Sequence, residues 1–137
     1  MRKPAGDTES LPVIIISEDD QDRLFDLAYA YEKRAPQVSE TLLAELNRAE
    51  VRSEDDMPAT VVGMGSTVHF KAEDGQDRTV TLVYPGQADI EAGKISVATP
   101  VGAALIGLTV GQSFRWAGRD GQGHLLTVVA VERKPAA

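Results

Sequence analysis

The chain has 137 residues, a net charge of −7 and no cysteine. Its 21 acids against 14 bases argue against a bare nucleic-acid binder, because phosphate neutralisation needs clustered lysine and arginine, so we expect no direct sequence-specific DNA binding. The absence of cysteine excludes a disulfide scaffold, thiol catalysis and thiolate metal sites. No apolar run approaches the roughly 18 residues of a membrane span, and no signal core follows the first residues. We therefore expect a cytoplasmic protein without a membrane partner.

The N-terminal third predicts an extended segment followed by two helices. Residues 1–10 are polar and are expected to form a disordered tail, whereas the β-branched run at 11–16 favours an extended backbone. Ser17 precedes three acids, which is typical of an N-cap and the first turn of a helix. The first helix is expected over about 18–33, with Pro36 as its stop signal. A second helix, expected from residue 37 or 39 to 50, should lie antiparallel to the first.

The pattern of apolar residues changes from Pro58 onward. Apolar and polar positions now alternate with the period of two that is typical of strands. Thr99, Pro100 and Gly107 carry the start and stop signals of one short helix within this region. The predicted fold class is therefore α+β: a short N-terminal antiparallel helical hairpin with its connector over 11–57, and a C-terminal antiparallel sheet with one helix over 58–137. The strands are expected near 67–71, 78–84, 95–97, 113–116 and 125–132.

Several phrases of the sequence closely resemble one family. PVGAALIGLTVGQ at 100–112 and LVYPG at 82–86 resemble the C-terminal domain of the Gre transcript-cleavage factors. LLAELNRA at 42–49 and the acid–Met–Pro step at 56–58 extend the likeness toward the N-terminus, so that from about residue 14 to 132 the chain resembles the regulators of nucleoside diphosphate kinase within that superfamily. The resemblance implies an FKBP-like C-terminal domain that docks on bacterial RNA polymerase.

The same resemblance directs attention to the tip of the helical hairpin. In Gre factors a long hairpin, a coiled coil, enters the secondary channel of the polymerase, and two acids at its tip help to bind a second Mg²⁺. Here the inferred tip, YAYEKRAPQV at 29–38, has a single acid beside two bases, and helices of about four turns are far shorter. We therefore do not expect cleavage stimulation. The candidate partner-binding residues at the tip are Tyr29, Tyr31, Glu32 and Arg34, although both tyrosines could instead be helix-packing residues.

The other candidate sites carry little chemistry. His69 and His124 stand on different predicted strands with no acid at a ligand spacing, so we interpret both as surface residues. The acids at 18–20 fit first-turn helix stabilisation, and those at 54–56 lack the spacing of a calcium loop. The glycine motifs lack the residues of a phosphate loop. The sequence therefore predicts no catalytic residue, no metal and no cofactor.

These observations predict a non-enzymatic transcription regulator that binds RNA polymerase near the secondary channel and competes with Gre-type factors. Two alternatives stay open: a transcript-cleavage-stimulating elongation factor, and an FKBP-like prolyl isomerase or chaperone. The isomerase would need an aromatic-lined pocket, which seven aromatic residues are too few to promise. We expect Tyr84, Phe114 and Trp116 to lie in the core instead.

Overall fold

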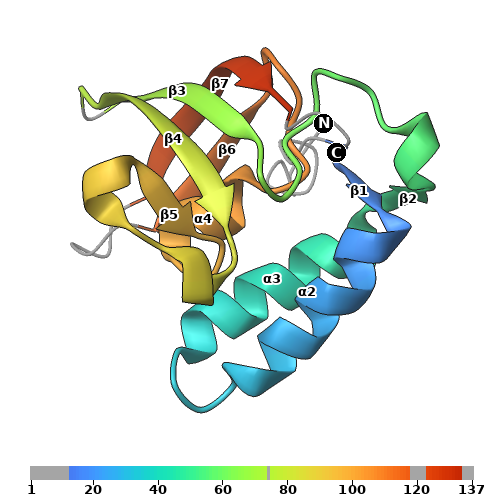
Figure 1. Cartoon of the computed structure of the whole chain (residues 1–137). Helices are drawn as coiled ribbons and strands as arrows, with labels where there is room; N and C mark the ends of the chain where they lie inside the picture. The colour runs from blue at the N-terminus through green and yellow to red at the C-terminus, as the bar shows by residue number, and fades with distance from the viewer. Residues whose placement is uncertain (1–12, 74, 118–122, 134–137) are drawn as a thin grey trace, which may run out of the picture.

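The computed structural model describes residues 13–73, 75–117 and 123–133 (Figure 1). The expected terminal tails, most of the expected turn over 118–123 and the side chains of Trp116 and His124 lie outside the described parts of the chain. The N-terminal third consists of strand β1 (Ile15–Ser17), helices α2 (Glu18–Ala30) and α3 (Pro36–Arg48), and strand β2 (Glu50–Arg52). The two helices run in opposite directions side by side, as predicted (Figure 1).

Both helices of the hairpin end earlier than their sequence signals indicate. Ser17 caps α2 as expected, since its Oγ accepts a hydrogen bond from Asp20 N at 3.1 Å. The helix stops at Ala30 rather than at residue 33, and Pro36 begins α3 instead of ending α2, because proline at the first helical position loses no hydrogen bond. The end of the second predicted helix is wrong, because residues 50–52 form strand β2.

Strand β2 forms because it finds a partner far back in the sequence. It pairs in parallel with β1, with Ile15 opposite Glu50, and Glu50 N donates to Ile14 O at 2.9 Å. On its other side β1 meets the C-terminal half, where Ile15 N donates to Gly107 O at 3.1 Å. The two ends of the hairpin therefore lie next to each other and are attached to the rest of the molecule.

The C-terminal half is a five-stranded sheet in the order β5-β4-β3-β7-β6. The β4–β5 pair is parallel, so the sheet is mixed rather than antiparallel throughout, and the expectation of an antiparallel sheet is wrong at this pair. The segment between these strands contains two 3₁₀ turns, Pro85–Gln87 and Ile90–Ala92, and it returns the chain to run alongside β4 in the same direction. The strands are β3 (Thr67–Ala72), β4 (Asp77–Val83), β5 (Lys94–Ser96), β6 (Ser113–Ala117) and β7 (Gly123–Glu132).

The short helix α4 (Pro100–Leu105) has the ends that the sequence predicts. Thr99 Oγ1 accepts from Gly102 N at 3.1 Å, and Pro100 occupies the first turn. Gly107 follows with φ +84°, a left-handed conformation that favours glycine. A Cβ on Gly102 would lie 2.2 Å from Ser96 O, so glycine at this position lets the helix approach β5 closely.

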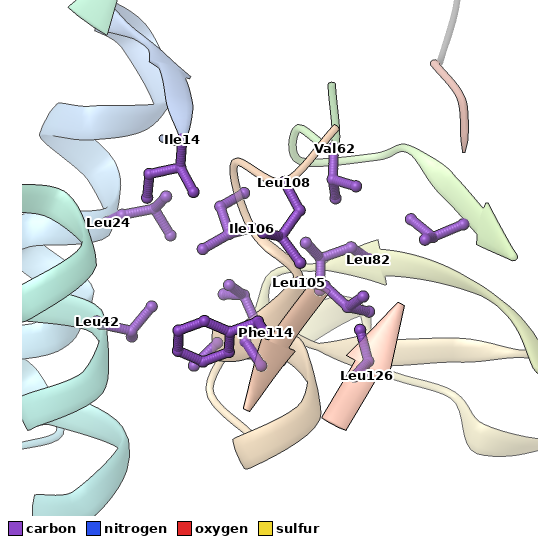
Figure 2. Packing of buried hydrophobic residues seen from close by; sticks show 14 of the residues in the cluster. Ile14, Leu24, Leu42, Val62, Leu82, Leu105, Ile106, Leu108, Phe114 and Leu126 are labelled. Carbon is purple, nitrogen blue, oxygen red and sulfur yellow. The ribbon is translucent and has the colours of Figure 1, made fainter. Parts of the chain in front are cut away.

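The hairpin and the sheet share one hydrophobic core (Figure 2). Ile14, Leu24 and Leu42 come from the N-terminal third and are fully buried against the C-terminal half. Tyr84 is packed against this core and Phe114 belongs to it, as expected. The predicted division into two domains at residues 57 and 58 stays a prediction, and the apolar packing crosses it. Figure 2 labels the C-terminal members Val62, Leu82, Leu105, Ile106, Leu108, Phe114 and Leu126.

Candidate functional site

The tip of the hairpin brings the four predicted residues together. Tyr29 lies in the last turn of α2 and has 57% of its surface exposed. The other aromatic residues with described side chains are buried or half-buried. Its ring stacks on Phe25, with the ring centroids 6.4 Å apart and the planes at 19°. Tyr31, Glu32 and Arg34 follow in the turn between the helices. Tyr29 is thus an exposed ring with Phe25 as its aromatic neighbour one helical turn earlier.

A second local pair shapes the turn itself. The guanidinium carbon of Arg34 lies 4.8 Å from the centre of the Tyr31 ring, within the range of a cation–π interaction. Glu32 and Lys33 are exposed beside this pair. The tip therefore offers aromatic and cationic groups, the residue types that dominate binding energy at protein interfaces, and it has no paired carboxylates for a metal.

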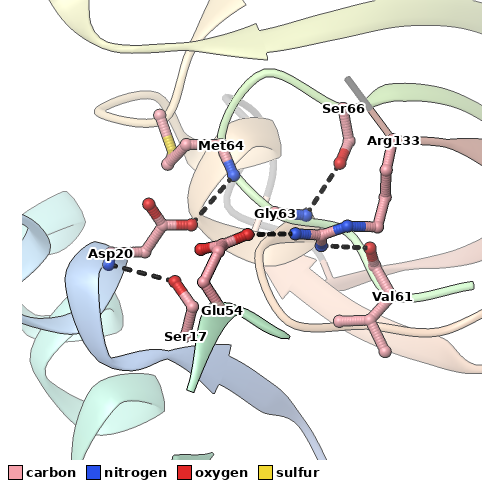
Figure 3. Close-up of polar contacts among 8 residues, drawn as sticks. All are labelled: Ser17, Asp20, Glu54, Val61, Gly63, Met64, Ser66 and Arg133. Atoms are coloured by element: carbon pink, nitrogen blue, oxygen red, sulfur yellow. Dashed lines mark hydrogen bonds and ion pairs between the residues drawn. The ribbon is translucent and has the colours of Figure 1, made fainter. Parts of the chain in front are cut away.

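The opposite end of the hairpin carries a polar joint that sequence reasoning missed (Figure 3). Asp20 Oδ2 accepts from the backbone N of Met64 at 3.2 Å, a contact between residues 44 positions apart. Burial raises the pKa of Asp20 above its usual range, and the hydrogen bond from Met64 N partly offsets that effect. Arg133 lies in the same joint and is paired with Glu54. No local sequence pattern signals these contacts, because each depends on the tertiary fold.

The other residues considered from the sequence, His69 and the acids at 54–56, lie at the surface of the structure. His69 has an acidic neighbour in the fold, because its Nε2 lies 2.6 Å from Asp77 Oδ1 on the adjacent strand. The pairing of β3 with β4 creates this contact, which sequence spacing does not reveal. Within the described residues no group of three metal-binding side chains occurs. The acids at 54–56 form an exposed 3₁₀ turn.

Two surface hollows flank the hairpin. One lies between α2 and the start of the 3₁₀ turn at Pro85, and there the Arg23 guanidinium carbon is 5.6 Å from the Tyr84 ring centre. Burial raises the pKa of Tyr84, and the nearby Asp20 carboxylate acts in the same direction. The other hollow separates the start of α3 from α4 and β6, and Phe114 is the aromatic among its described lining residues. Neither of these two hollows is lined by the several aromatic rings that the isomerase hypothesis requires.

The family of the chain emerges from comparison with known proteins. Residues 57–133 match the family model described as "Transcription elongation factor, GreA/GreB, C-term", and residues 12–51 match the model "Rnk N-terminus". The chain belongs to the GreA/GreB C-terminal family. The matches meet at the connector, so the hairpin and the sheet correspond to two recognised sequence units.

Relatives in two groups support this assignment. The chain is 40% identical over 129 residues to the "Regulator of nucleoside diphosphate kinase" of Escherichia coli strain K12, covering 93% of this chain and 95% of that protein. It is 43% identical over 68 residues to the "Transcription elongation factor GreA" of Rhodospirillum rubrum, which covers 49% of this chain and 43% of that factor. These relatives carry the names of regulators and elongation factors rather than of enzymes.

A solved structure confirms the fold class. The "Prokaryotic transcription elongation factor GreA/GreB from Nitrosomonas europaea" has a TM-score of 0.69 and 39% identity, covering 87% of this chain and 98% of that chain. The α+β arrangement of a helical N-terminal region and a C-terminal sheet is therefore confirmed. The FKBP-like topology stays a prediction. Among the described residues no helix is both long and apolar enough to cross a membrane.

Proposed function

We propose that this protein is a non-enzymatic transcription regulator that acts in the cytoplasm, binds RNA polymerase near its secondary channel and competes with Gre-type factors. The observation that carries the proposal is the GreA/GreB C-terminal match over residues 57–133, joined here to a short, basic-tipped hairpin. The sheet domain would dock on the polymerase, and the hairpin would occupy part of the channel entrance. The tip residues Tyr29, Tyr31, Glu32 and Arg34 are the proposed hairpin contacts.

The dimensions of the hairpin support regulation by occupancy. Each helix has 13 residues, which gives a length of about 20 Å at 1.5 Å per residue. A hairpin of this length does not extend as far as the long hairpins that the Gre resemblance describes. Competition for the channel mouth requires contact only at the entrance, so a short hairpin is sufficient for it.

The chemistry of the tip argues against the first alternative, cleavage stimulation. A weakly held divalent cation needs several oxygen ligands, because each one supplies only part of the charge compensation. The turn offers Glu32 as its acid, and Lys33 and Arg34 next to it disfavour a cation electrostatically. The isomerase alternative needs several aromatic rings in one pocket, and each of the two hollows described above holds one aromatic, Tyr84 or Phe114.

A binding experiment tests the docking half of the proposal. The immobilised protein is exposed to purified core polymerase in an interferometer, and the expected dissociation constant is on the order of micromolar because one small domain offers a limited contact area. Arg34→Ala should weaken binding, whereas Asp55→Ala, in the exposed connector outside both the tip and the sheet, should not. Absence of binding at tens of micromolar would refute the proposal.

A cleavage assay tests the competition half. Stalled, backtracked transcription complexes receive this protein alone and then a Gre factor with increasing amounts of this protein. We expect no cleavage above the intrinsic rate from this protein alone, and a progressive loss of Gre-stimulated cleavage on titration. Stimulation by this protein alone would favour the elongation-factor alternative, and undiminished Gre activity at saturation would exclude a shared site.

A further inference from the structure

The guanidinium of Arg133 links two segments that lie between the hairpin and the sheet, the connector at Glu54 and the loop that begins at Val61 (Figure 3). Arg133 directly follows the last strand, β7, and its Nη1 donates to Val61 O at 3.2 Å. Its Nη2 donates to Glu54 Oε2 at 2.9 Å, and the Arg133 side chain is only 20% exposed. Glu54 belongs to the connector after β2, so a single guanidinium bridges the connector and the 61–66 loop to the end of the sheet.

Gly63 in the bridged loop makes room for this cation. A Cβ built on Gly63 would lie 2.8 Å from Arg133 Nη1, a distance that real side chains do not adopt. Gly63 does not occupy the left-handed region, so its backbone conformation does not itself demand glycine. Ser66 Oγ accepts from Gly63 N at 2.9 Å and holds the loop in this shape. A side chain at position 63 would therefore have to displace the Arg133 guanidinium from its bonds to Val61 O and Glu54.

The other side of the loop holds the start of the hairpin. Met64 N donates to Asp20 Oδ2 in the first turn of α2. The loop is thus fixed on one side by Arg133 and on the other side by Asp20, and Glu54 ties the connector to the same point. We call Asp20, Glu54, Val61, Gly63, Met64 and Arg133 the base joint. These contacts lie at the end of the hairpin opposite to the tip.

We propose that Arg133 is a positioning residue that sets the angle between the hairpin and the sheet, and with it the location of the tip. The hydrophobic effect is a non-directional driving force, whereas hydrogen bonds to a charged guanidinium require a particular geometry. Because the helices are about 20 Å long, a rotation of 10° at the base joint moves the tip by about 3.5 Å. The inference concerns the shape of the free protein and does not depend on polymerase binding.

A distance measurement tests the proposal directly. The chain has no cysteine, so spin labels can be attached to Lys33→Cys at the tip and Lys71→Cys on β3. Double electron–electron resonance then reports the distance between tip and sheet in the full chain. Arg133→Met should shift the mean distance by several ångströms or broaden its distribution. The control Arg78→Met, which removes an exposed arginine from β4, should leave the distribution unchanged.

A double-mutant cycle keeps the proposal testable if Arg133→Met folds poorly. Gly63→Ala should lower the melting temperature measurably in the parent chain, because the added methyl displaces the guanidinium from its two hydrogen bonds. The same change should cost far less in the Arg133→Met background, where the displaced group is absent. In an Arg133→Lys background, the cost of Gly63→Ala should lie between its cost in the parent and its cost in the Arg133→Met background. An ammonium lacks the planar fork that reaches Val61 O and Glu54 together.

Two results would overturn the proposal. One is an unchanged tip-to-sheet distance in folded Arg133→Met, Arg133→Lys or Gly63→Ala protein, even if these variants are less stable, because Arg133 would then be merely structural. The other is an equal cost of Gly63→Ala with and without Arg133, because the glycine would then serve another purpose. Polymerase binding enters neither readout, so failure of the proposed function would leave both results interpretable.

Discussion

The two ends of the hairpin are built in opposite ways. At the tip, the specific contacts join near neighbours in sequence: Phe25 with Tyr29, and Tyr31 with Arg34. At the base joint they join residues 44 to 79 positions apart, such as Asp20 with Met64 and Glu54 with Arg133. The tip can therefore vary its surface chemistry without cost to the fold, whereas the base must keep its partners. Under the proposed function, this arrangement would let the tip change its contacts with a partner while the base keeps its geometry.

Leu42→Ala should have the largest effect on stability. Leu42 is fully buried where α3 meets the shared core, and truncation of buried leucine typically costs about 2–5 kcal/mol in unfolding free energy. Urea unfolding of the variant measures the loss. Leu43→Ala at the neighbouring, half-buried position is the control and should cost clearly less. Equal costs at both positions would mean that the hairpin does not share the core of the sheet.

Gly107→Ala should come next, at about 2 kcal/mol. The left-handed conformation of Gly107 costs an alanine roughly 1 kcal/mol, and the new Cβ would also lie 2.9 Å from Ile14 Cβ. Gly111→Ala is a matched control, because Gly111 has φ +89° but no atom within 4 Å of a built Cβ. The difference between the two melting temperatures isolates the contact with Ile14, the residue just before β1. If Gly111→Ala is the more costly change, the contact with Ile14 contributes nothing.

Substitutions at the tip should change stability little and binding more. Tyr29→Ala removes an exposed ring stacked on Phe25, which is worth at most about 1 kcal/mol. Under the proposed function, the same change should weaken polymerase binding several-fold. Thermal unfolding and interferometry on one preparation measure both effects. A loss of stability as large as that of Leu42→Ala would show that the tip is part of the structural core.

Asp20→Asn should give the smallest effect and one that depends on pH. Burial raises the pKa of Asp20 in the folded state, so its contribution to stability is fully present below the unfolded pKa and is lost as pH rises through the folded value. Asparagine keeps an oxygen that can accept from Met64 N but carries no buried charge. The variant should therefore melt slightly higher than the parent at pH 7, and the difference should shrink as pH falls toward 4. A difference that grows on acidification would contradict this account.

The elements predicted correctly from sequence are those determined by local chemistry. Ser17 and Thr99 act as helix caps, Pro100 opens α4, and Gly107 takes the left-handed conformation, because each depends on a few adjacent residues. The tip shows the limit of such signals, because the pattern predicted helix as far as residue 33, whereas Tyr31 and Arg34 lie in the turn. Strand β2 and the parallel β4–β5 pair depend on partners that only the folded chain supplies. Arg133 gave no signal at all, since its partner Val61 O lies 72 positions away and is a backbone atom.

The parallel pairing of β1 with β2 has a consequence for how this architecture can change. Because Ile15 stands opposite Glu50, the chain enters and leaves the hairpin at adjacent points. The hairpin therefore begins and ends at neighbouring points of the molecule, where β1 and β2 pair. Equal numbers of helical turns can be added to or removed from both arms while the strand pair and the Asp20–Met64 contact stay as they are. The length of the hairpin can then change by about 1.5 Å for each residue added to both helices. The same base can therefore hold a short hairpin or a long one.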